Sequence, residues 1–167
     1  MNRAAAVSPL SGVRYWARLD PSREAIVDGD VHMTYADLLA RVEATAAYFQ
    51  SMGARRGSVI GMSLRNSLDA LVIPLAAAAL GAQISPVNFR LKARELGSIA
   101  AHMNATVFVY GDDLSGEMER ASLHTSAAFI AHADFETGLK AFEGKRGGDG
   151  FATSCGRRSA WSARPAR

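Results

Sequence analysis

The pattern of apolar and polar positions switches repeatedly between strand-like and helix-like periods along most of the chain. In chain order, the expected elements are a helix between Thr34 and Gly53, a strand at 59–64, a helix at 68–80, a strand at 83–87, a helix at 93–103, a strand at 106–110, a helix at 115–123, a strand at 127–131 and a helix at 135–142. Short apolar strands that alternate with helices predict an α/β fold. The sheet is expected to be parallel and doubly wound, with helices on both faces and right-handed crossovers.

An antiparallel hairpin is predicted ahead of these repeats. Residues 24–27 and 31–33 are short β-rich runs, and Asp28-Gly29-Asp30 between them is a turn sequence. Thr34 then stands at a helix N-cap position. Asp37 follows three residues later, as in a capping box.

The first residues carry arginines and no acidic residue before Asp20, as a transit peptide does. However, Val13, Trp16 and Ala17 fall on one face of a helix, and we interpret the segment as an amphipathic leading helix. The apolar run after Arg3 is too short for a secretory signal peptide, and no apolar run reaches 18 residues. We therefore expect a cytoplasmic protein with no membrane span.

The helices differ in how much of their surface is apolar. The segment 68–80 is apolar almost all round, which is typical of a buried helix, and Pro74 is expected to bend it. In the segment 93–103, the side chains expected to face inward are Leu96, Ile99, Ala100 and Met103. Gly111-Asp112-Asp113 is predicted to turn the chain.

Ligands of parallel sheets bind outside the carboxyl ends of the strands. Three predicted loops lie there, namely Arg65-Asn66, residues 88–91 and residues 111–113. The pattern therefore indicates where a ligand binds, without indicating which ligand.

Charge is unevenly distributed, although the whole chain of 167 residues has a net charge of only +3. Residues 1–143 hold 13 basic and 15 acidic residues, whereas residues 144–167 hold 6 basic residues and 1 acidic residue. The second segment consists mainly of Gly, Ala, Ser and Arg and lacks apolar periodicity, so we interpret it as a disordered basic tail. A nucleic-acid-binding tail is the alternative, but only Phe151 and Trp161 could stack on bases. No nucleic-acid partner is expected.

Several kinds of chemistry are excluded by missing motifs. Cys155 is the only cysteine, which rules out a disulfide framework or a cysteine zinc site. No glycine-rich dinucleotide motif, P-loop or nucleophile elbow occurs. The four histidines, His32, His102, His124 and His132, lack the spacing of a helical metal pair and are interpreted as surface or packing residues. Asp112-Asp113 is interpreted as a turn, with a Mg²⁺ site as the alternative, and no metal site is predicted.

An ordered set of short motifs carries a family resemblance. The matching positions are 21–29, 34–38, Gly53 and Gly57 before Val59, Asn66, Gly81, Pro86, Asn88, Arg90, Leu91, Glu95 and Leu96. In this order and with these gaps, the segment from Pro21 to about Tyr110 resembles the start of adenylate-forming (AMP-binding) acyl-CoA synthetases. The Asn-x-Arg-Leu loop followed by Glu-Leu is most similar to the acyl- and aryl-CoA ligase branch.

The resemblance implies the first part of the large N-terminal domain of these enzymes, here residues 1–143. It implies ATP, Mg²⁺ and coenzyme A as cofactors and a small-molecule carboxylate as substrate. Family members are several hundred residues long, and their lysine-bearing phosphate loop and mobile C-terminal domain have no counterpart here. We therefore expect a truncated ligase that is inactive alone and binds no cofactor tightly. The tail at 144–167 is similar to out-of-frame translation of GC-rich DNA.

Among the matching residues, one implies a binding role. In some ligases of this branch, the arginine of the Asn-x-Arg-Leu loop contacts the nucleotide phosphate of coenzyme A, and that residue is Arg90 here. Its guanidinium also suits a phosphate by chemistry alone. The alternatives are a solvated Arg90 or an ion pair with Glu95. Asn66 and Asn88 are expected to fix loop backbone, and no catalytic residue is predicted.

Two other interpretations of the whole chain remain open. One is a free-standing, non-catalytic α/β domain that binds a nucleotide or a partner. The other is the nucleic-acid binder that acts through the tail. Neither the acyl substrate nor an oligomeric state is indicated by the pattern.

Overall fold

The structure, a computed structural model, describes residues 8–122 and 125–143. The predicted tail at 144–167 and His124 lie outside the described residues. The elements are α1 (Pro9–Leu19), β1 (Glu24–Asp28), β2 (Val31–Thr34), α2 (Tyr35–Ser51), β3 (Val59–Ser63), α3 (Leu68–Leu80), β4 (Gln83–Pro86), α4 (Ala93–His102), β5 (Val107–Tyr110), the 3-10 helix η1 (Asp112–Leu114), α5 (Ser115–Ser122), β6 (Ala128–Ala131) and α6 (His132–Leu139).

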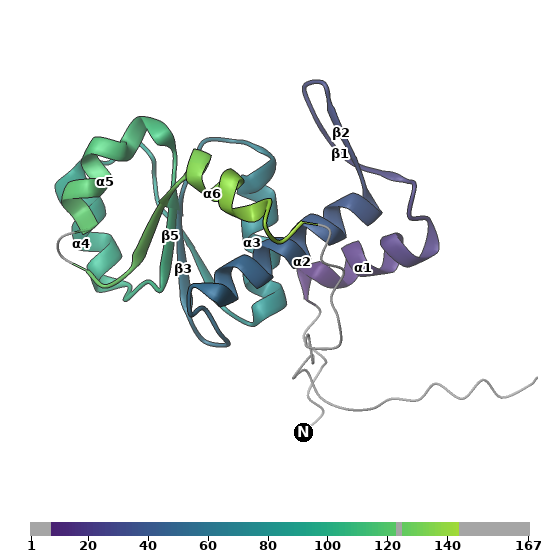
Figure 1. The fold of residues 1–167 in the computed structure, drawn as a ribbon, viewed down its shortest axis with the longest axis horizontal. Helices are drawn as coiled ribbons and strands as arrows, with labels where there is room; N and C mark the ends of the chain where they lie inside the picture. Colours follow the sequence, from purple (N-terminus) through teal and green to yellow (C-terminus); the bar gives the residue numbers. More distant parts are fainter. Residues whose placement is uncertain (1–7, 123–124, 144–167) are drawn as a thin grey trace, which may run out of the picture.

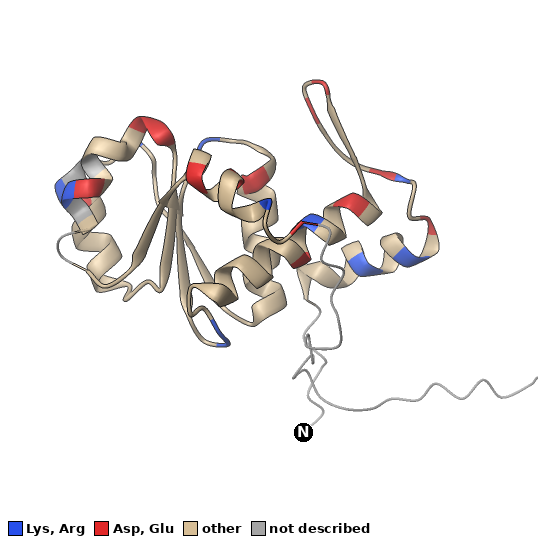
Figure 2. Cartoon of the chain, viewed as in Figure 1, with Lys and Arg blue, Asp and Glu red and all other residues tan. Residues whose placement is uncertain are grey.

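The main sheet has four strands in the order β4-β3-β5-β6, and all its neighbours run parallel. α2, α3 and α6 cover one face, with α1 packed outside them, and α4 and α5 cover the other face (Figure 1). The predicted parallel sheet with helices on both faces is therefore confirmed. Its strands carry no charged residue, and the charges lie on helices, loops and the hairpin (Figure 2).

Each face of the sheet has its own apolar core because successive side chains of a strand point to opposite faces. On β5, Val107 and Val109 enter the larger core under α2, α3 and α6. Phe108 between them enters the smaller core under α4 and α5, together with Leu96 and Met118. The predicted leading helix α1 joins the larger core through Leu10 and Val13.

The predicted hairpin and helix start are also confirmed. β1 and β2 pair antiparallel around Gly29, whose φ of 60° suits a residue without a Cβ. The hydroxyl of Thr34 accepts a hydrogen bond from the backbone N–H of Asp37, and the Asp37 carboxylate accepts one from the backbone N–H of Thr34. These two bonds satisfy donors that a helix start leaves free.

Three local predictions were wrong in detail. Ile99, expected to face inward, is 36% exposed, because the buried stripe of α4 is centred on Leu96 and Ala100 and Ile99 lies at its edge. Leu71 is 55% exposed, so α3 buries one side rather than its whole surface. The helix expected at 135–142 begins earlier, at His132, since Asp112 Oδ1 accepts a hydrogen bond from the backbone N–H of Ala133. The predicted turn at 111–113 is present, and residues 112–114 of it form a short 3-10 helix.

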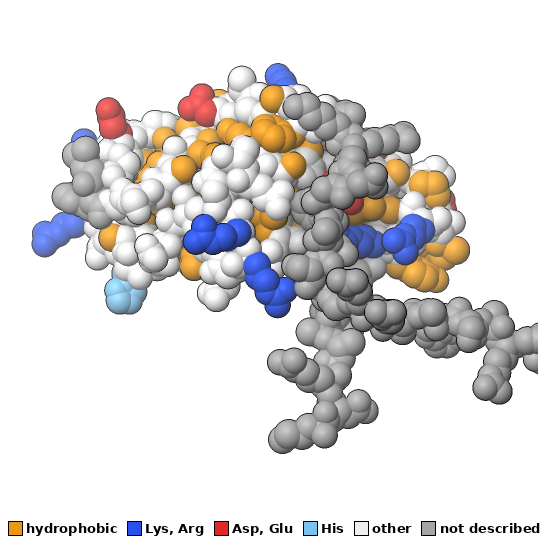
Figure 3. All heavy atoms as spheres, turned by 60° about the horizontal axis from the view of Figure 1, so that its bottom comes forward, with side chains coloured by type: hydrophobic (Ala, Val, Ile, Leu, Met, Phe, Trp, Pro, Cys, Tyr) orange, Lys and Arg blue, Asp and Glu red, His pale blue; other side chains and the backbone are white. Residues whose placement is uncertain are grey.

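Within the described ranges, no helix has the length and apolar character needed to cross a bilayer. Apolar side chains nevertheless reach the surface in places, and Figure 3 shows them among charged groups on one face. The large exposed ones are Tyr15, Leu19, Val27, Val31, Leu71 and Ile99.

Candidate functional site

Three loops meet where parallel strands end. Arg65 follows β3, Phe89 and Arg90 follow β4, and Asp113 follows β5, and together they line one hollow of about 390 Å³. The prediction that these loops are adjacent is confirmed, because the carboxyl ends of parallel strands share one edge of the sheet.

This hollow is predominantly basic. The Arg65 guanidinium carbon lies 4.8 Å from the centre of the Phe89 ring, and that of Arg90 lies 5.5 Å from it. Lys92 adds a third basic side chain, and Asp113 is the one carboxylate in the lining. Asp113 Oδ2 lies 2.8 Å from Arg65 Nη2. The arrangement leaves positive charge uncompensated and therefore suits an anion.

The loop that carries Arg90 is held by its own polar residues. The backbone N–H of Arg90 donates to Asn88 Oδ1 at 3.0 Å, which is the backbone role expected of Asn88. The backbone N–H of Lys92 donates to Glu95 Oε2 at 3.0 Å. Among the described residues, no ion pair joins Glu95 to Arg90, and no side-chain hydrogen bond of Asn66 is found. Arg90 is exposed, and its role toward phosphate stays a prediction.

A second charged cluster lies where α2, α3 and α6 meet. Asp69, at the start of α3, is only 2% exposed, and its carboxylate accepts hydrogen bonds from Arg41 Nε at 3.1 Å and Nη2 at 2.8 Å. His132 Nε2 lies 2.8 Å from the other carboxylate oxygen, and Arg41 also donates to Glu136 and Glu143. We call Arg41, Asp69, His132 and Glu136 the Asp69 cluster.

The pKa values of the two carboxyl groups Asp69 and Glu136 in this cluster are shifted in opposite directions. Burial raises the pKa of Asp69, but hydrogen bonds with Glu136, His132 and Arg41 outweigh burial and hold the pKa below the ordinary 3.8. The pKa of Glu136 is raised above 4.5 by burial, by its hydrogen bond with Asp69 and by the Asp69 charge, against the opposing effect of Arg41. Asp69 is therefore the residue that holds the negative charge, and Glu136 is the one that more readily takes a proton.

Metal-type ligand atoms also come together in this cluster. One ligand atom each of Asp69, His132 and Glu136 lie within 4.8 Å of one another. The Arg41 guanidinium already supplies a cation to both carboxylates, so the arrangement is explained as an ion network that holds α6 to α2 and α3. Sequence analysis missed this cluster because it examined only the spacing between histidines. The available signal was an Asp in the first turn of a helix that is otherwise apolar.

The two aspartates of the predicted turn are both engaged. Asp113 pairs with Arg65, and Asp112 Oδ1 accepts the Ala133 backbone N–H at 3.0 Å. These partners favour the turn interpretation over a Mg²⁺ site. His32 pairs with Glu24 at 2.6 Å on the hairpin, and His102 is exposed at the end of α4, as expected of surface residues.

We expect Glu136→Gln to change how stability depends on pH. A carboxyl group with a raised folded pKa contributes stability below its unfolded pKa and loses that contribution as the pH rises through the folded value. The free energy of unfolding of the natural chain should therefore fall relative to that of Glu136→Gln as the pH rises above 4.5. Urea unfolding of both chains between pH 4 and 7 measures this difference.

The lowered pKa of Asp69 affects stability in a different pH range. Its pKa is lowered, so its contribution to stability is lost only as the pH falls below 3.8. A difference between the two chains that stays constant from pH 4 to 7 would contradict the assignment of the raised pKa to Glu136.

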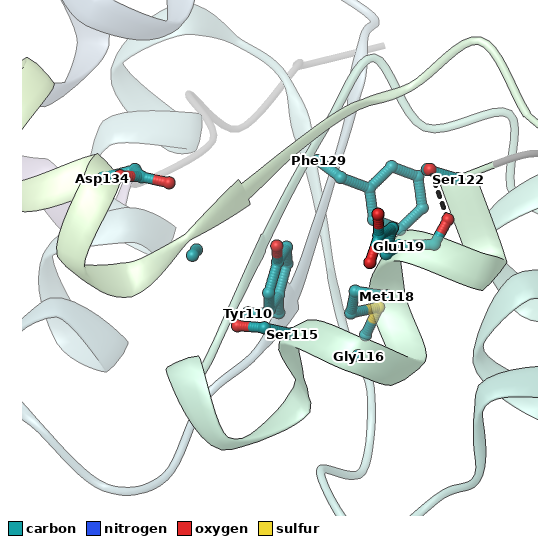
Figure 4. A pocket seen from close by; sticks show the side chains of 9 residues that line it. Tyr110, Ser115, Gly116, Met118, Glu119, Ser122, Phe129 and Asp134 are labelled. Carbon is teal, nitrogen blue, oxygen red and sulfur yellow. Dashed lines mark hydrogen bonds between the residues drawn. The ribbon is translucent and has the colours of Figure 1, made fainter.

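Another hollow, of about 480 Å³, lies between α5 and the ends of β5 and β6 (Figure 4). Tyr110, Glu119, Phe129 and Asp134 are among its lining residues. Burial raises the pKa of Tyr110, and the charge of Asp134 adds to the effect. The phenol is therefore a neutral hydrogen-bonding group, and an anion would meet the two carboxylates here. Phosphate chemistry is better suited to the hollow at Arg65 and Arg90.

Known proteins share this chain's sequence pattern. The family model described as "AMP-binding enzyme" matches residues 13–149. Long-chain-fatty-acid–CoA ligase FadD13 of Mycobacterium tuberculosis (strain ATCC 25618 / H37Rv) is 32% identical over 101 residues, which are 59% of this chain and 20% of the ligase. The 4-chlorobenzoate–CoA ligase of an Arthrobacter species is 35% identical over 86 residues, which are 50% of this chain and 16% of that ligase.

Solved structures share the fold. A Mycobacterium tuberculosis fatty acyl CoA synthetase superposes with a TM-score of 0.71 at 25% identity, covering 77% of this chain and 27% of that chain. The fold is thus that of the N-terminal domain of adenylate-forming enzymes, and the chain spans only a fragment of its acyl-CoA ligase relatives. Because the family model matches residues 13–149, which are most of this chain, the chain belongs to the AMP-binding enzyme family.

Proposed function

We propose that this chain forms part of an ATP-dependent acid–CoA ligase. In the first step, a carboxylate oxygen attacks the α-phosphorus of ATP, which gives an acyl-adenylate and releases pyrophosphate. In the second step, the sulfur of coenzyme A attacks the acyl carbonyl carbon and AMP leaves. The substrate is a small-molecule carboxylate, and the site of action proposed is the cytoplasm. Family membership and similarity to a fatty-acid–CoA ligase support this proposal.

The observation that carries the proposal is the position of Arg90. It stands at the carboxyl edge of the sheet, in a hollow with Arg65 and Lys92. Guanidinium groups form paired, charge-assisted hydrogen bonds with phosphate oxygens. We assign to Arg90 the binding of the nucleotide phosphate of coenzyme A. It neutralises the charge of that phosphate and so helps to hold the thiol end of coenzyme A in register for the second step.

The other cofactors fit this chain less well. ATP and Mg²⁺ are implied by the family, but the acidic pair Asp112 and Asp113 is already engaged by the Ala133 N–H and by Arg65. The Asp69 carboxylate is likewise paired with Arg41 and His132. These residues are thus not arranged as a Mg²⁺ site, and we propose that residues 1–167 by themselves bind none of the three cofactors tightly.

Residues 1–167 alone are expected to show no adenylation activity. With no lysine-bearing phosphate loop, the chain lacks the group that would neutralise charge developing on the ATP phosphates. ATP–pyrophosphate exchange with a panel of aliphatic and aromatic carboxylic acids should stay at background, while a full-length acyl-CoA ligase run in parallel shows exchange. Exchange above background that depends on the carboxylic acid would refute the predicted inactivity.

A non-catalytic nucleotide- or partner-binding domain would also lack exchange activity. It differs in its response to ligand, because a ligand that binds the folded state tightly raises the melting temperature with concentration. Thermal unfolding with and without millimolar ATP or coenzyme A separates the two interpretations. The ligase proposal expects little change, and a rise of several degrees would favour the free-standing domain.

A further inference from the structure

Arg65 belongs to the same hollow as Arg90, although it comes from a different loop. Both guanidinium groups lie against the ring of Phe89, at 4.8 Å and 5.5 Å from its centre. The two cations repel each other, and an anion that contacts both would offset this repulsion. Asp113 pairs with Arg65, and within the described part of the chain no carboxylate pairs with Arg90.

We propose that Arg65 and Arg90 together bind one phosphomonoester group of a nucleotide in the hollow beside Phe89, and that Arg65 exchanges Asp113 for this group. The inference rests on the proposed function, because it concerns the same phosphate that we assign to Arg90. The inference adds Arg65 as a second phosphate-binding residue and Asp113 as a carboxylate that competes with the phosphate for Arg65. A phosphomonoester carries close to two negative charges at neutral pH, whereas Asp113 carries one.

The present partner of Arg65 is easily displaced. The side chains of Arg65 and Asp113 are 68% and 50% exposed, and ion pairs this exposed contribute little because water and salt screen them. Phosphate offers Arg65 a bidentate partner of higher charge. Phe89 keeps both guanidinium groups beside the hollow during the exchange, through cation–π contact. Lys92 adds further attraction at the rim.

A purely structural Arg65–Asp113 pair makes the opposite prediction for one variant. If the pair only fixes the loops after β3 and β5, then Asp113→Asn loosens the hollow and weakens anion binding. If Asp113 competes with the ligand, the same change frees Arg65 and strengthens binding. This substitution keeps the size and shape of the side chain and removes its charge.

The test is a titration of the full chain, labelled with ¹⁵N, with adenosine 3′,5′-bisphosphate, which is the nucleotide end of coenzyme A. Backbone amide shifts detect weak binding and report whether each variant is folded. Arg65→Gln and Arg90→Gln should each weaken binding about tenfold, and Asp113→Asn should tighten it about threefold. Arg55→Gln is the matched control, since Arg55 is exposed in the turn before β3, away from the hollow, and binding should be unchanged.

The outcomes separate the two proposals. Arg65→Gln that binds like the natural chain, or Asp113→Asn that binds more weakly, overturns this inference while Arg90→Gln still tests the assignment of Arg90. Weakening by Arg65→Gln with no effect of Arg90→Gln overturns the assignment of Arg90, and with it the shared site, and leaves Arg65 as the phosphate ligand. Inorganic phosphate that binds as tightly as the bisphosphate would overturn the nucleotide part of the inference, and the absence of all binding overturns both.

Discussion

Replacing Arg41 with methionine should lower the free energy of unfolding by about 3 kcal/mol, one of the largest losses expected for a side chain outside the apolar cores. The guanidinium holds the carboxylate of Asp69, which is 2% exposed, through two hydrogen bonds. Methionine matches the volume of the aliphatic stem but leaves that charge buried beside Glu136. Chemical denaturation at pH 7 of the natural chain and the variant measures the loss.

A double variant tests whether charge compensation is the cause. In Arg41→Met combined with Asp69→Asn, the buried carboxylate charge is removed, and the other carboxylates that lose Arg41, those of Glu136 and Glu143, are 40% and 45% exposed to water. Much of the lost stability should therefore return. Arg55→Met serves as the control for removing an exposed arginine and should change stability by less than about 0.5 kcal/mol. A double variant as unstable as Arg41→Met alone would show that packing of the Arg41 stem, rather than its charge, accounts for the loss.

The elements that sequence analysis placed correctly are those with local signals. The start of α2 depends on Thr34 and Asp37, which are three residues apart, and the hairpin depends on Gly29 within its own turn. The apolar strands could also be identified from the sequence, because a strand that is covered on both faces consists of a continuous run of apolar residues. The order of these strands and helices was then enough to predict a parallel sheet and to place three loops at its carboxyl edge, by general rules of chain topology.

Features that depend on tertiary contacts were not foreseen. Arg41 and Glu136 are 95 residues apart in the chain, and Arg65 and Asp113 are 48 apart, so no local spacing indicates either pair. Ile99 was misplaced for a related reason: helical periodicity gives a stripe but not its width, which depends on the neighbouring helix. The sequence pointed to Arg90 through a family resemblance, whereas its neighbour Arg65 became visible only in the structure.

Two charged clusters thus follow the carboxyl ends of the strands and differ in their charge balance. In the Asp69 cluster, a buried carboxylate has an arginine and a histidine as partners, which suits a permanent structural contact. In the hollow lined by Arg65, Arg90 and Lys92, which we call the Arg65 hollow, the basic groups are exposed and outnumber the single lining carboxylate, that of Asp113. Exposed positive charge is well solvated by water, so an excess of it destabilises the fold little, and it attracts an anionic ligand. The balance of charge therefore favours the Arg65 hollow as the binding site.

Gly61→Ala should lower the free energy of unfolding by about 3 kcal/mol, although it adds one methyl group. Gly61 lies on β3 directly opposite Phe108 of β5, and a Cβ at this position would clash with Cδ2 of the Phe108 ring. Phe108 cannot easily move, because it is fully buried and stacks on Phe129 with ring centres 5.3 Å apart. Thermal and urea unfolding of the full chain measure the loss.

A second glycine isolates the steric cause. At Gly12, in the exposed part of α1, an added Cβ meets nothing within 4 Å, so Gly12→Ala should raise stability by about 0.5–1 kcal/mol through helix propensity alone. Phe108→Leu combined with Gly61→Ala should cost less than the sum of the two single changes, because the smaller side chain yields the space that the methyl group needs. Additive losses, or a stable Gly61→Ala, would mean that the Phe108 ring does not lie over Gly61. The smaller core would then not depend on this close contact between β3 and β5, and Gly61 would be replaceable by any small residue.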